Sequence, residues 1–157
     1  MAIADMFLKM QDVTGEASDA DHKGEIQVTS WSWGMNAAKT IPHGSPTGRV
    51  TVSELEIVKR VDQSSATLMG FLKNNKLTAE AKLTVRKAGQ TPLEYFSIEM
   101  RNVRVTSIKD ESEASELVER MTLAFDKVKV TYTPQSAKGA KGGGAVLFET
   151  DTAAPST

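Results

Sequence analysis

Apolar and polar residues alternate over most of the chain, which is the pattern of half-buried β-strands. The first such segment is residues 6–11, where Met6, Leu8 and Met10 alternate with Phe7, Lys9 and Gln11. The clearest alternation covers residues 79–86, where every second side chain is apolar. Further strands are predicted over residues 25–33, 50–57, 93–108, 117–125 and 128–133. About eight strands of this kind are typical of a single β-barrel or two-sheet sandwich.

The apolar side of the strand changes within some of these segments. In the segment 25–33 the apolar parity changes between Val28 and Trp31, and similar changes occur within 50–57 and 93–108. A β-bulge has this effect, because one extra residue re-aims every side chain that follows it. We therefore predict strands that bend from one sheet into the next, as barrel closure requires.

One short segment has the pattern of a helix instead. Leu68, Met69 and Leu72 form a single apolar stripe, Ser64 or Ser65 can cap its start, and Asn74-Asn75 ends it. A helix of roughly ten residues is marginal alone, so we expect it to pack on the sheet.

Two other segments interrupt the strands. Residues 34–48 contain several glycines and prolines, and loops beyond ~12–15 residues are usually functional or disordered. A passive loop and a functional one both remain open at this point. Residues 109–116 are predicted to form an acidic loop.

Pro134 ends the periodic region, and the remainder is rich in Gly, Ala, Lys and Thr. Its single apolar island is Ala145–Phe148. The predicted organisation is therefore one β-barrel domain over residues 1–134, followed by a flexible tail over residues 135–157. The tail is too short to fold alone, since chains below ~40 residues usually need cross-links.

The composition excludes several classes of function. The 157 residues include 19 basic and 20 acidic side chains, a net charge of −1, which disfavours a nucleic-acid partner. With no cysteine, the chain has no disulfide, thiolate metal site or cysteine nucleophile. The sequence lacks a secretory signal pattern and any run of ~20 apolar residues, so we expect a cytoplasmic protein without membrane insertion.

Two motifs match part of a chemical signature. Asp19, Asp21 and His22 offer metal-binding groups, but an EF-hand loop starting at Asp19 needs glutamate at its twelfth position, where Ser30 stands. The glycines of residues 138–144 do not continue into the Lys-Ser/Thr and helix of a P-loop. We therefore expect a solvated turn and a flexible linker, with no metal, no cofactor and no catalytic residue.

The two tryptophans suggest how one strand is oriented. Trp31 and Trp33 share one parity, and tryptophan is highly buried on average, so Ser30 and Ser32 should face the opposite surface. That surface is small, polar and flat, which suits packing of subunits or the lining of a cavity. Ordinary solvent exposure of the serines is the alternative that periodicity leaves open.

Many segments, in order along the chain, resemble the haemolysin-coregulated proteins (Hcp) of the bacterial type VI secretion system. The longest is His22-Lys-Gly-Glu-Ile-Gln-Val-Thr-Ser-Trp-Ser-Trp-Gly34. The others are residues 5–10, 15–19, 55–57, 61–68, 81–89, 94–100, 119–125 and 130–135. The chain departs from the family near its end, because many members carry a Gly-Trp-Asp-like segment where this chain has Leu147-Phe-Glu-Thr-Asp-Thr152.

The resemblance implies a two-sheet β-barrel with one helix on its flank and no catalytic residue. It also implies that six copies form a ring and that rings stack into a tube, related to contractile phage tail tubes. A contracting sheath expels this tube, so the implied partners are further copies, sheath and spike proteins, and effector proteins in the lumen. The protein is then cytoplasmic before firing and secreted by the type VI system without a cleaved signal peptide.

Candidate contacts follow from combining the resemblance with the residue patterns. The long loop resembles the family's extended loop, which reaches the next subunit or ring, and Ser30 and Ser32 are candidates for the lumen wall. The candidate ring or stacking contacts in the loop are Lys39, Thr40, Ile41, Pro42, His43 and Ser45. The alternative function is a monomeric cytoplasmic β-barrel that binds a peptide or a carbohydrate.

Overall fold

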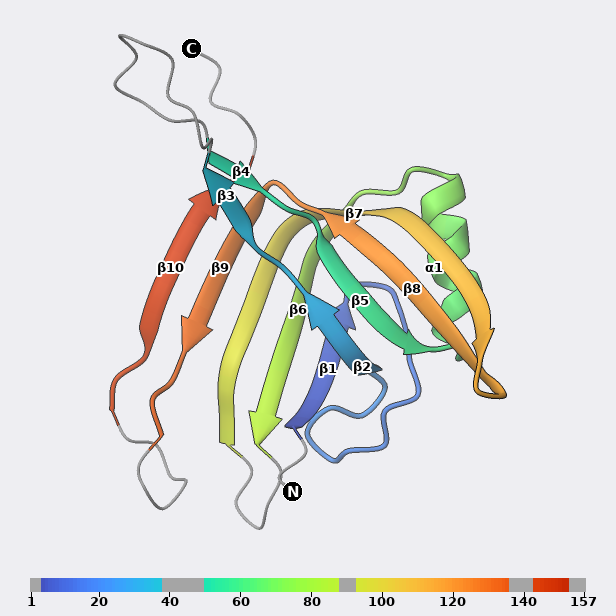
Figure 1. The fold of residues 1–157 in the computed structure, drawn as a ribbon, viewed down its shortest axis with the longest axis horizontal. Coiled ribbons are helices and arrows are strands. Elements are labelled where there is room, and N and C mark those ends of the chain that lie inside the picture. Colours follow the sequence, from blue (N-terminus) through green and yellow to red (C-terminus); the bar gives the residue numbers. More distant parts are fainter. Residues whose placement is uncertain (1–3, 38–49, 88–92, 136–142, 153–157) are drawn as a thin grey trace, which may run out of the picture.

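The structure is a computed structural model that describes residues 4–37, 50–87, 93–135 and 143–152 (Figure 1). Its helix α1 spans Ser64–Lys73 and packs against strand β7. The strands are β1 Ala4–Met10, β2 Ile26–Ser32, β3 Met35–Ala37, β4 Val50–Val52, β5 Leu55–Arg60, β6 Thr78–Lys87, β7 Leu93–Glu113, β8 Glu116–Ala124, β9 Lys127–Tyr132 and β10 Val146–Asp151.

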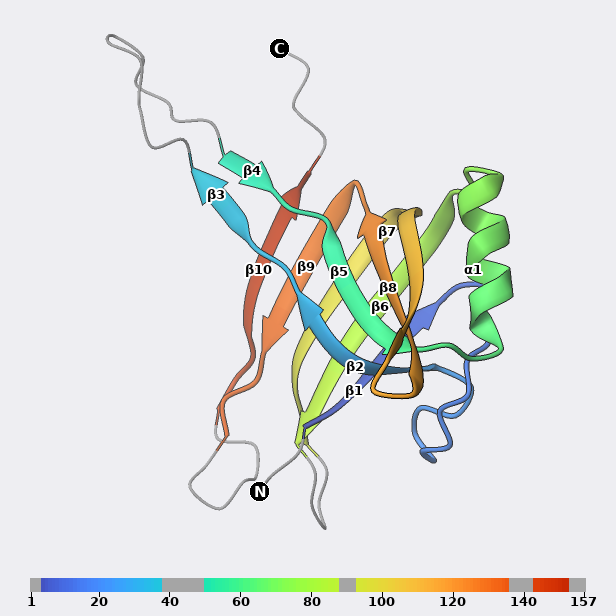
Figure 2. The same cartoon turned by 45° about the vertical axis from the view of Figure 1, so that its right-hand side comes forward.

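Most of these strands form one antiparallel sheet that closes on itself. Its strand order in the described part of the chain is β10-β9-β7-β6-β1-β2-β5-β8, and a further pairing of β7 with β8 closes the barrel. Strands β9 and β10 follow β7 on the outside of this closed part (Figures 1 and 2). Strands β3 and β4 pair only with each other, as a separate small sheet. The prediction of a mainly-β barrel with one short helix is confirmed.

Two of the three changes of apolar parity, in 25–33 and 93–108, mark bends that close the barrel, whereas the segment 50–57, predicted as one strand, is divided into β4 and β5 of different sheets. The register of β2 against β5 shifts between Val28 and Ser30. Strand β7 bends at Asn102, whose φ of 53° lies in the left-handed region that asparagine tolerates better than most residues. Before this bend β7 pairs with β6 and β9, and after it β7 pairs with β8. A single long strand therefore belongs to both halves of the barrel.

The core lies between these two halves. Leu8, Leu83 and Ile98 face one another across β1, β6 and β7, and all three are fully buried. Ile57 and Met121 form an equivalent buried pair across β5 and β8. Each fully buried side chain of this size contributes roughly 1.5–3 kcal/mol. The alternation in the sequence therefore corresponds to real burial on one face of each strand.

Helix α1 lies where predicted, but its cap differs. Gln63 occupies the N-cap position without a side-chain cap, and Ser64 and Ser65 are buried inside the first turn. The carboxylate of Asp62 accepts a hydrogen bond from the Ser64 backbone N–H at 2.9 Å. The prediction of a serine cap is therefore wrong, because an aspartate two residues earlier supplies the acceptor.

The predicted acidic loop over residues 109–116 is a tight hairpin instead. Strand β7 continues to Glu113, and Ala114 and Ser115, both with positive φ, turn the chain into β8. The Arg120 side chain donates from Nε to the Glu111 carboxylate at 2.7 Å across the hairpin. This pairing explains why an acidic stretch continues as a strand: a cation on the neighbouring strand compensates its charge.

The flexible tail predicted for residues 135–157 is wrong for Val146–Asp151, which form β10. This strand pairs with β9 over its whole length, from Val146 opposite Tyr132 to Asp151 opposite Lys127. Three of its six residues, Val146–Phe148, belong to the apolar island of the sequence. The strand also needs a backbone partner, and β9 provides it, which the composition of the tail does not indicate. The division into a domain of residues 1–134 and a tail stays a prediction.

Candidate functional site

Ser30 and Ser32 lie exposed on the outer face of β2. Trp31 points the other way and stacks on Phe96 of β7, with ring centroids 5.4 Å apart, and Trp33 also packs against the core. The opposition of serines and tryptophans inferred from the sequence is therefore present in the fold. Whether the serines line a lumen stays a prediction.

A polar row continues across the barrel from Ser32. Ser32 is opposite Glu56, Glu56 is opposite Thr122, and Thr122 is opposite Ser107. The hydroxyls of Ser107 and Thr122 are hydrogen-bonded at 2.7 Å. This row is consequently polar over four neighbouring strands, β2, β5, β8 and β7, whereas the adjacent row on the same face continues from Ser30 into Val58, Arg120 and Lys109.

The six candidate contact residues of the long loop, Lys39 to Ser45, lie outside the described residues. What is described is the base of this loop, a two-stranded ribbon of β3 and β4, here called the ribbon. Gly34 and Ser53 close its base through two hydrogen bonds of 2.9 Å, one from each backbone N–H. The ribbon then leads away from the barrel (Figure 2).

The ribbon has one apolar face. Met35 pairs with Val52 and Ala37 pairs with Val50, so all four side chains lie on the same side. Met35 is 44% exposed and Val50 is 60% exposed, whereas Val52, near the base, touches the core. The ribbon is therefore amphipathic, and most of its apolar face is uncovered in a single chain.

Strands β9 and β10 form a second extension, here called the overhang. Its inner face continues the core side of β7, with Tyr132, Val146 and Phe148 exposed by 45%, 62% and 42%. Its other face is mostly polar: it includes an ion pair between Lys129 and Glu149 at 3.8 Å and one exposed apolar side chain, Leu147. The inner face is uncovered because β7 bends at Asn102 and takes the rest of the barrel away from it.

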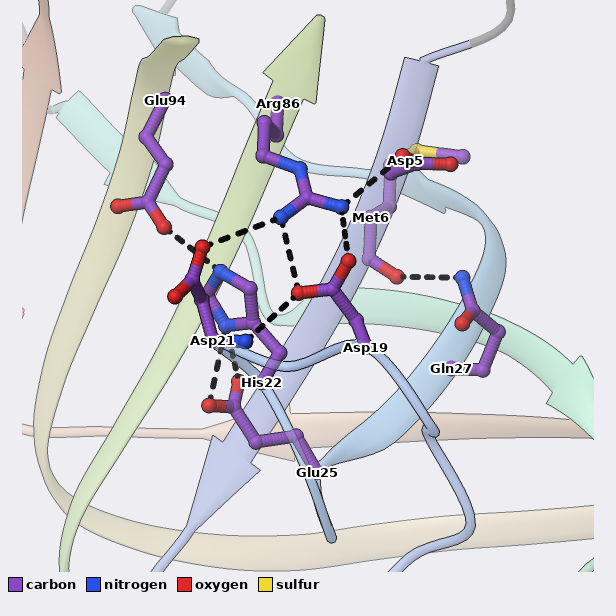
Figure 3. Close-up of polar contacts among 9 residues, drawn as sticks. All are labelled: Asp5, Met6, Asp19, Asp21, His22, Glu25, Gln27, Arg86 and Glu94. Carbon is purple, nitrogen blue, oxygen red and sulfur yellow. Dashed lines mark hydrogen bonds and ion pairs between the residues drawn. The ribbon is translucent and has the colours of Figure 1, made fainter. Parts of the chain in front are cut away.

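The turn that contains Asp19 binds a buried arginine of the barrel (Figure 3). Arg86 of β6 is nearly buried and donates to both carboxylate oxygens of Asp19 and, at 3.2 Å, to Asp5 of β1. The hydrogen bonds from Arg86, and then that from the Asp21 backbone N–H, lower the pKa of Asp19 to about 2. The same contacts raise the pKa of Arg86. The turn is thereby fixed to the sheet.

His22 is buried, contrary to the prediction of a solvated turn. It is 7% exposed and its ring stacks on Phe7 with centroids 4.3 Å apart. Its Nδ1 lies 3.0 Å from the Glu25 carboxylate and its Nε2 lies 2.6 Å from that of Glu94 on β7 (Figure 3). In the described part of the chain, no group of three His, Asp or Glu side chains is arranged to hold a metal ion. The histidine ties the turn to the barrel.

A second charged cluster lies inside the protein. The ammonium group of Lys59, fully buried on β5, lies 2.8 Å from Glu119 of β8 and 3.0 Å from Asp62. It also donates to Ser65 of α1 at 3.2 Å. Burial raises the pKa of Glu119, and the adjacent Lys59 opposes this rise. The cluster joins the start of α1 to two strands of the barrel.

Sequence reasoning missed both clusters. Arg86 lies on the polar parity of its strand, where a charged residue is expected to face water, whereas Lys59 continues the apolar parity of Leu55 and Ile57. Asp19 and Glu119, which pair with Arg86 and Lys59, are far away in the chain, so the one available signal was the core-side parity of Lys59.

These features define a closed β-barrel protein whose charged clusters hold its own turn and helix in place and whose two β-extensions carry uncovered apolar faces. No helix in the described residues is both long and apolar enough to cross a membrane. The crystal structure of Hcp1 from Salmonella typhimurium is similar over 97% of this chain and 96% of its own, with a TM-score of 0.80 and 30% identity. A type VI secretion system effector from Yersinia pestis matches 94% of this chain and 99% of its own, with a TM-score of 0.76 and 27% identity.

The sequence comparisons agree with the structural ones. The model of the family described as "Type VI secretion system effector, Hcp" matches residues 7–132. Protein hcp1 of Pseudomonas aeruginosa is 41% identical over 149 residues, which are 92% of each chain. The chain therefore belongs to the Hcp family of type VI secretion proteins, and the resemblance found in the sequence is confirmed. This membership supports a structural role in the secretion tube.

Proposed function

We propose that six copies of this chain form a ring and that the rings stack into the inner tube of a type VI secretion system. The sheath expels this tube, and effector proteins travel in its lumen. The observation that supports assembly best is the pair of uncovered apolar faces, on the ribbon and on the overhang. Contiguous exposed apolar surface of this kind marks interaction sites in proteins that are otherwise well packed.

A ring needs two different surfaces on each copy. In a closed ring every joint is heterologous: one surface of a subunit meets a different surface of its neighbour. The ribbon and the overhang are two such surfaces, at different places on the barrel. The net charge of −1 per copy also favours stacking, because identical rings then repel one another little.

The lumen wall is assigned to the face of β2 that carries Ser30 and Ser32. Its support is the polar row that runs from Ser32 through Glu56 and Thr122 to Ser107 across four strands. The long loop predicted over residues 34–48 is assigned to contacts with the next subunit or ring, with sheath and spike proteins as further partners of the tube.

The mass of the protein in solution tests this function. Light scattering coupled to gel filtration is expected to give the mass of six chains, and electron microscopy is expected to show rings or tubes. A single-chain mass at every concentration contradicts the ring and favours the alternative, a monomeric module for a peptide or carbohydrate.

Effector loading tests the assignment of the lumen. Replacing Ser32→Lys is expected to reduce the amount of effector that co-purifies with the rings, while the mass of the rings stays unchanged. Asn74→Lys, an exposed change at the end of α1, is the matched control and should leave loading intact. Equal loading in the two variants refutes this lumen wall.

A further inference from the structure

The ribbon is too small to hold its shape alone. Each strand has three residues, and an isolated two-stranded hairpin is at best marginally stable in water. Among the described elements, β3 and β4 pack substantially only on each other, apart from Val52 at the base. Met35 and Val50 thus form an apolar surface that has no cover within its own chain.

The overhang also has an apolar face that nothing in its own chain covers. Its two strands pair with the barrel through one side of β9 only, and the outer edge of β10 is unpaired in the described structure. Tyr132, Val146 and Phe148 lie next to one another on its inner face, because Val146 is opposite Tyr132 and Phe148 follows two residues later. Its other face carries the Lys129–Glu149 ion pair and a single exposed apolar side chain, Leu147, so the inner face is the one with a contiguous apolar surface.

The two surfaces match in size and in chemistry. Both are two strands wide, and β10 with six residues is twice as long as β3, so the overhang offers enough length to seat the ribbon. Both present aliphatic or aromatic side chains and turn their polar side outward. Two such sheets pack face to face at a spacing of about 10 Å.

We propose that the apolar face of the ribbon packs on the inner face of the overhang of a second copy of this chain. The proposal rests on the assembly proposed above and names the joint that holds it together. The joint is heterologous, since ribbon and overhang are different surfaces, so each copy offers one of each and the contact repeats from copy to copy. It covers both apolar faces at the same time.

Cross-linking between single-cysteine variants tests this joint, because the natural chain has no cysteine. Val50→Cys places a thiol on the ribbon and Val146→Cys places one on the overhang, at positions that are 60% and 62% exposed in the single chain. A short bis-maleimide is the reagent, because packed sheets stand further apart than a disulfide spans. One variant carries a tag, so that mixed and like pairs differ in mass.

The expected result is a cross-linked pair that contains one chain of each variant. The matched controls, Thr51→Cys and Leu147→Cys, place exposed thiols on the opposite faces of the same two elements and should give at most a small fraction of this product. The chain with both Val50→Cys and Val146→Cys should give a series of linked copies. A series that ends at six places the joint within a ring, and a longer one places it between rings.

Three results overturn the proposal. If the intact protein assembles but the mixed pair does not form, the joint is wrong while the tube function stands. If the chain with both cysteines links only to itself, the ribbon covers the overhang of its own chain. If the intact protein remains a single copy, the joint and the proposed function both fail.

Discussion

Replacing the buried Lys59 tests how much its ion pairs contribute to the stability of the fold. Its ammonium group contacts Glu119 at 2.8 Å and Asp62 at 3.0 Å, and it donates to Ser65 at 3.2 Å. The change Lys59→Met keeps an unbranched chain of similar length but removes the charge. It leaves Glu119, fully buried on β8, without its cation.

The expected loss in the free energy of unfolding is about 3–5 kcal/mol at neutral pH, as for other buried pairs that lose one partner. The loss should shrink at lower pH. Burial already raises the pKa of Glu119, and removing Lys59 raises it further. A carboxyl whose pKa is higher in the folded state destabilises the fold increasingly as the pH rises above its unfolded value, and protonation relieves this cost.

Urea unfolding, followed by the fluorescence of Trp31 and Trp33, measures this loss. With a slope of about 2 kcal/mol per molar urea, the midpoint should fall by about 2 M. The matched control is Arg60→Met, which breaks the exposed ion pair of Arg60 with Glu116 at 3.2 Å and should cost at most about 1 kcal/mol. The reasoning is refuted if both variants lose the same small amount of unfolding free energy. It is also refuted if the Lys59→Met variant loses no more unfolding free energy at pH 8 than at pH 5.

Two other changes test the turn and the backbone. Since Arg86 lowers the pKa of Asp19 to about 2 from 3.8, the stability that this pair supplies is complete above pH 4 and is lost as the pH falls towards 2. Asp19→Asn should therefore reduce the change of melting temperature with pH over that range. The same change with pH in the variant and in the natural chain contradicts the pairing. Gly15→Ala places a Cβ 2.5 Å from the Glu25 carbonyl oxygen and should lower stability by about 2 kcal/mol, or about 4–8 °C in Tm by calorimetry. Gly70→Ala, on open helix surface, is its control and should raise stability by up to about 1 kcal/mol; equal melting temperatures of the two variants argue against the clash.

Much of the barrel could be predicted from local patterns. Alternation located most strands, because one face of each is buried and the other is solvated. The change of parity at Val28 and Trp31 correctly indicated a bulge, since burial leaves no other way for both sets of side chains to face inward. The tight hairpin at Ala114 was missed, because acidic residues in a strand depend on a partner such as Arg120 that the pattern does not contain.

The site was predicted only in part. The outward orientation of Ser30 and Ser32 was predicted from the opposite orientation of Trp31 and Trp33. The structure confirms this orientation. The burial of His22 did not follow, because its partners Glu94 and Phe7 come from strands that are distant in sequence. Strand β10 was missed for the same reason: a short apolar island becomes a strand only when a free edge such as that of β9 is available.

The sequence by itself determined the class of fold, the positions of most strands and the family, since these depend on local periodicity and on the residue types in order. Tertiary structure alone decided which charges are buried and which apolar faces are left uncovered. Both depend on pairing between distant strands: β7 changes partners at Asn102, closes the barrel with β8 and leaves β9 and β10 outside. The overhang is a product of that topology, and no local pattern contains it.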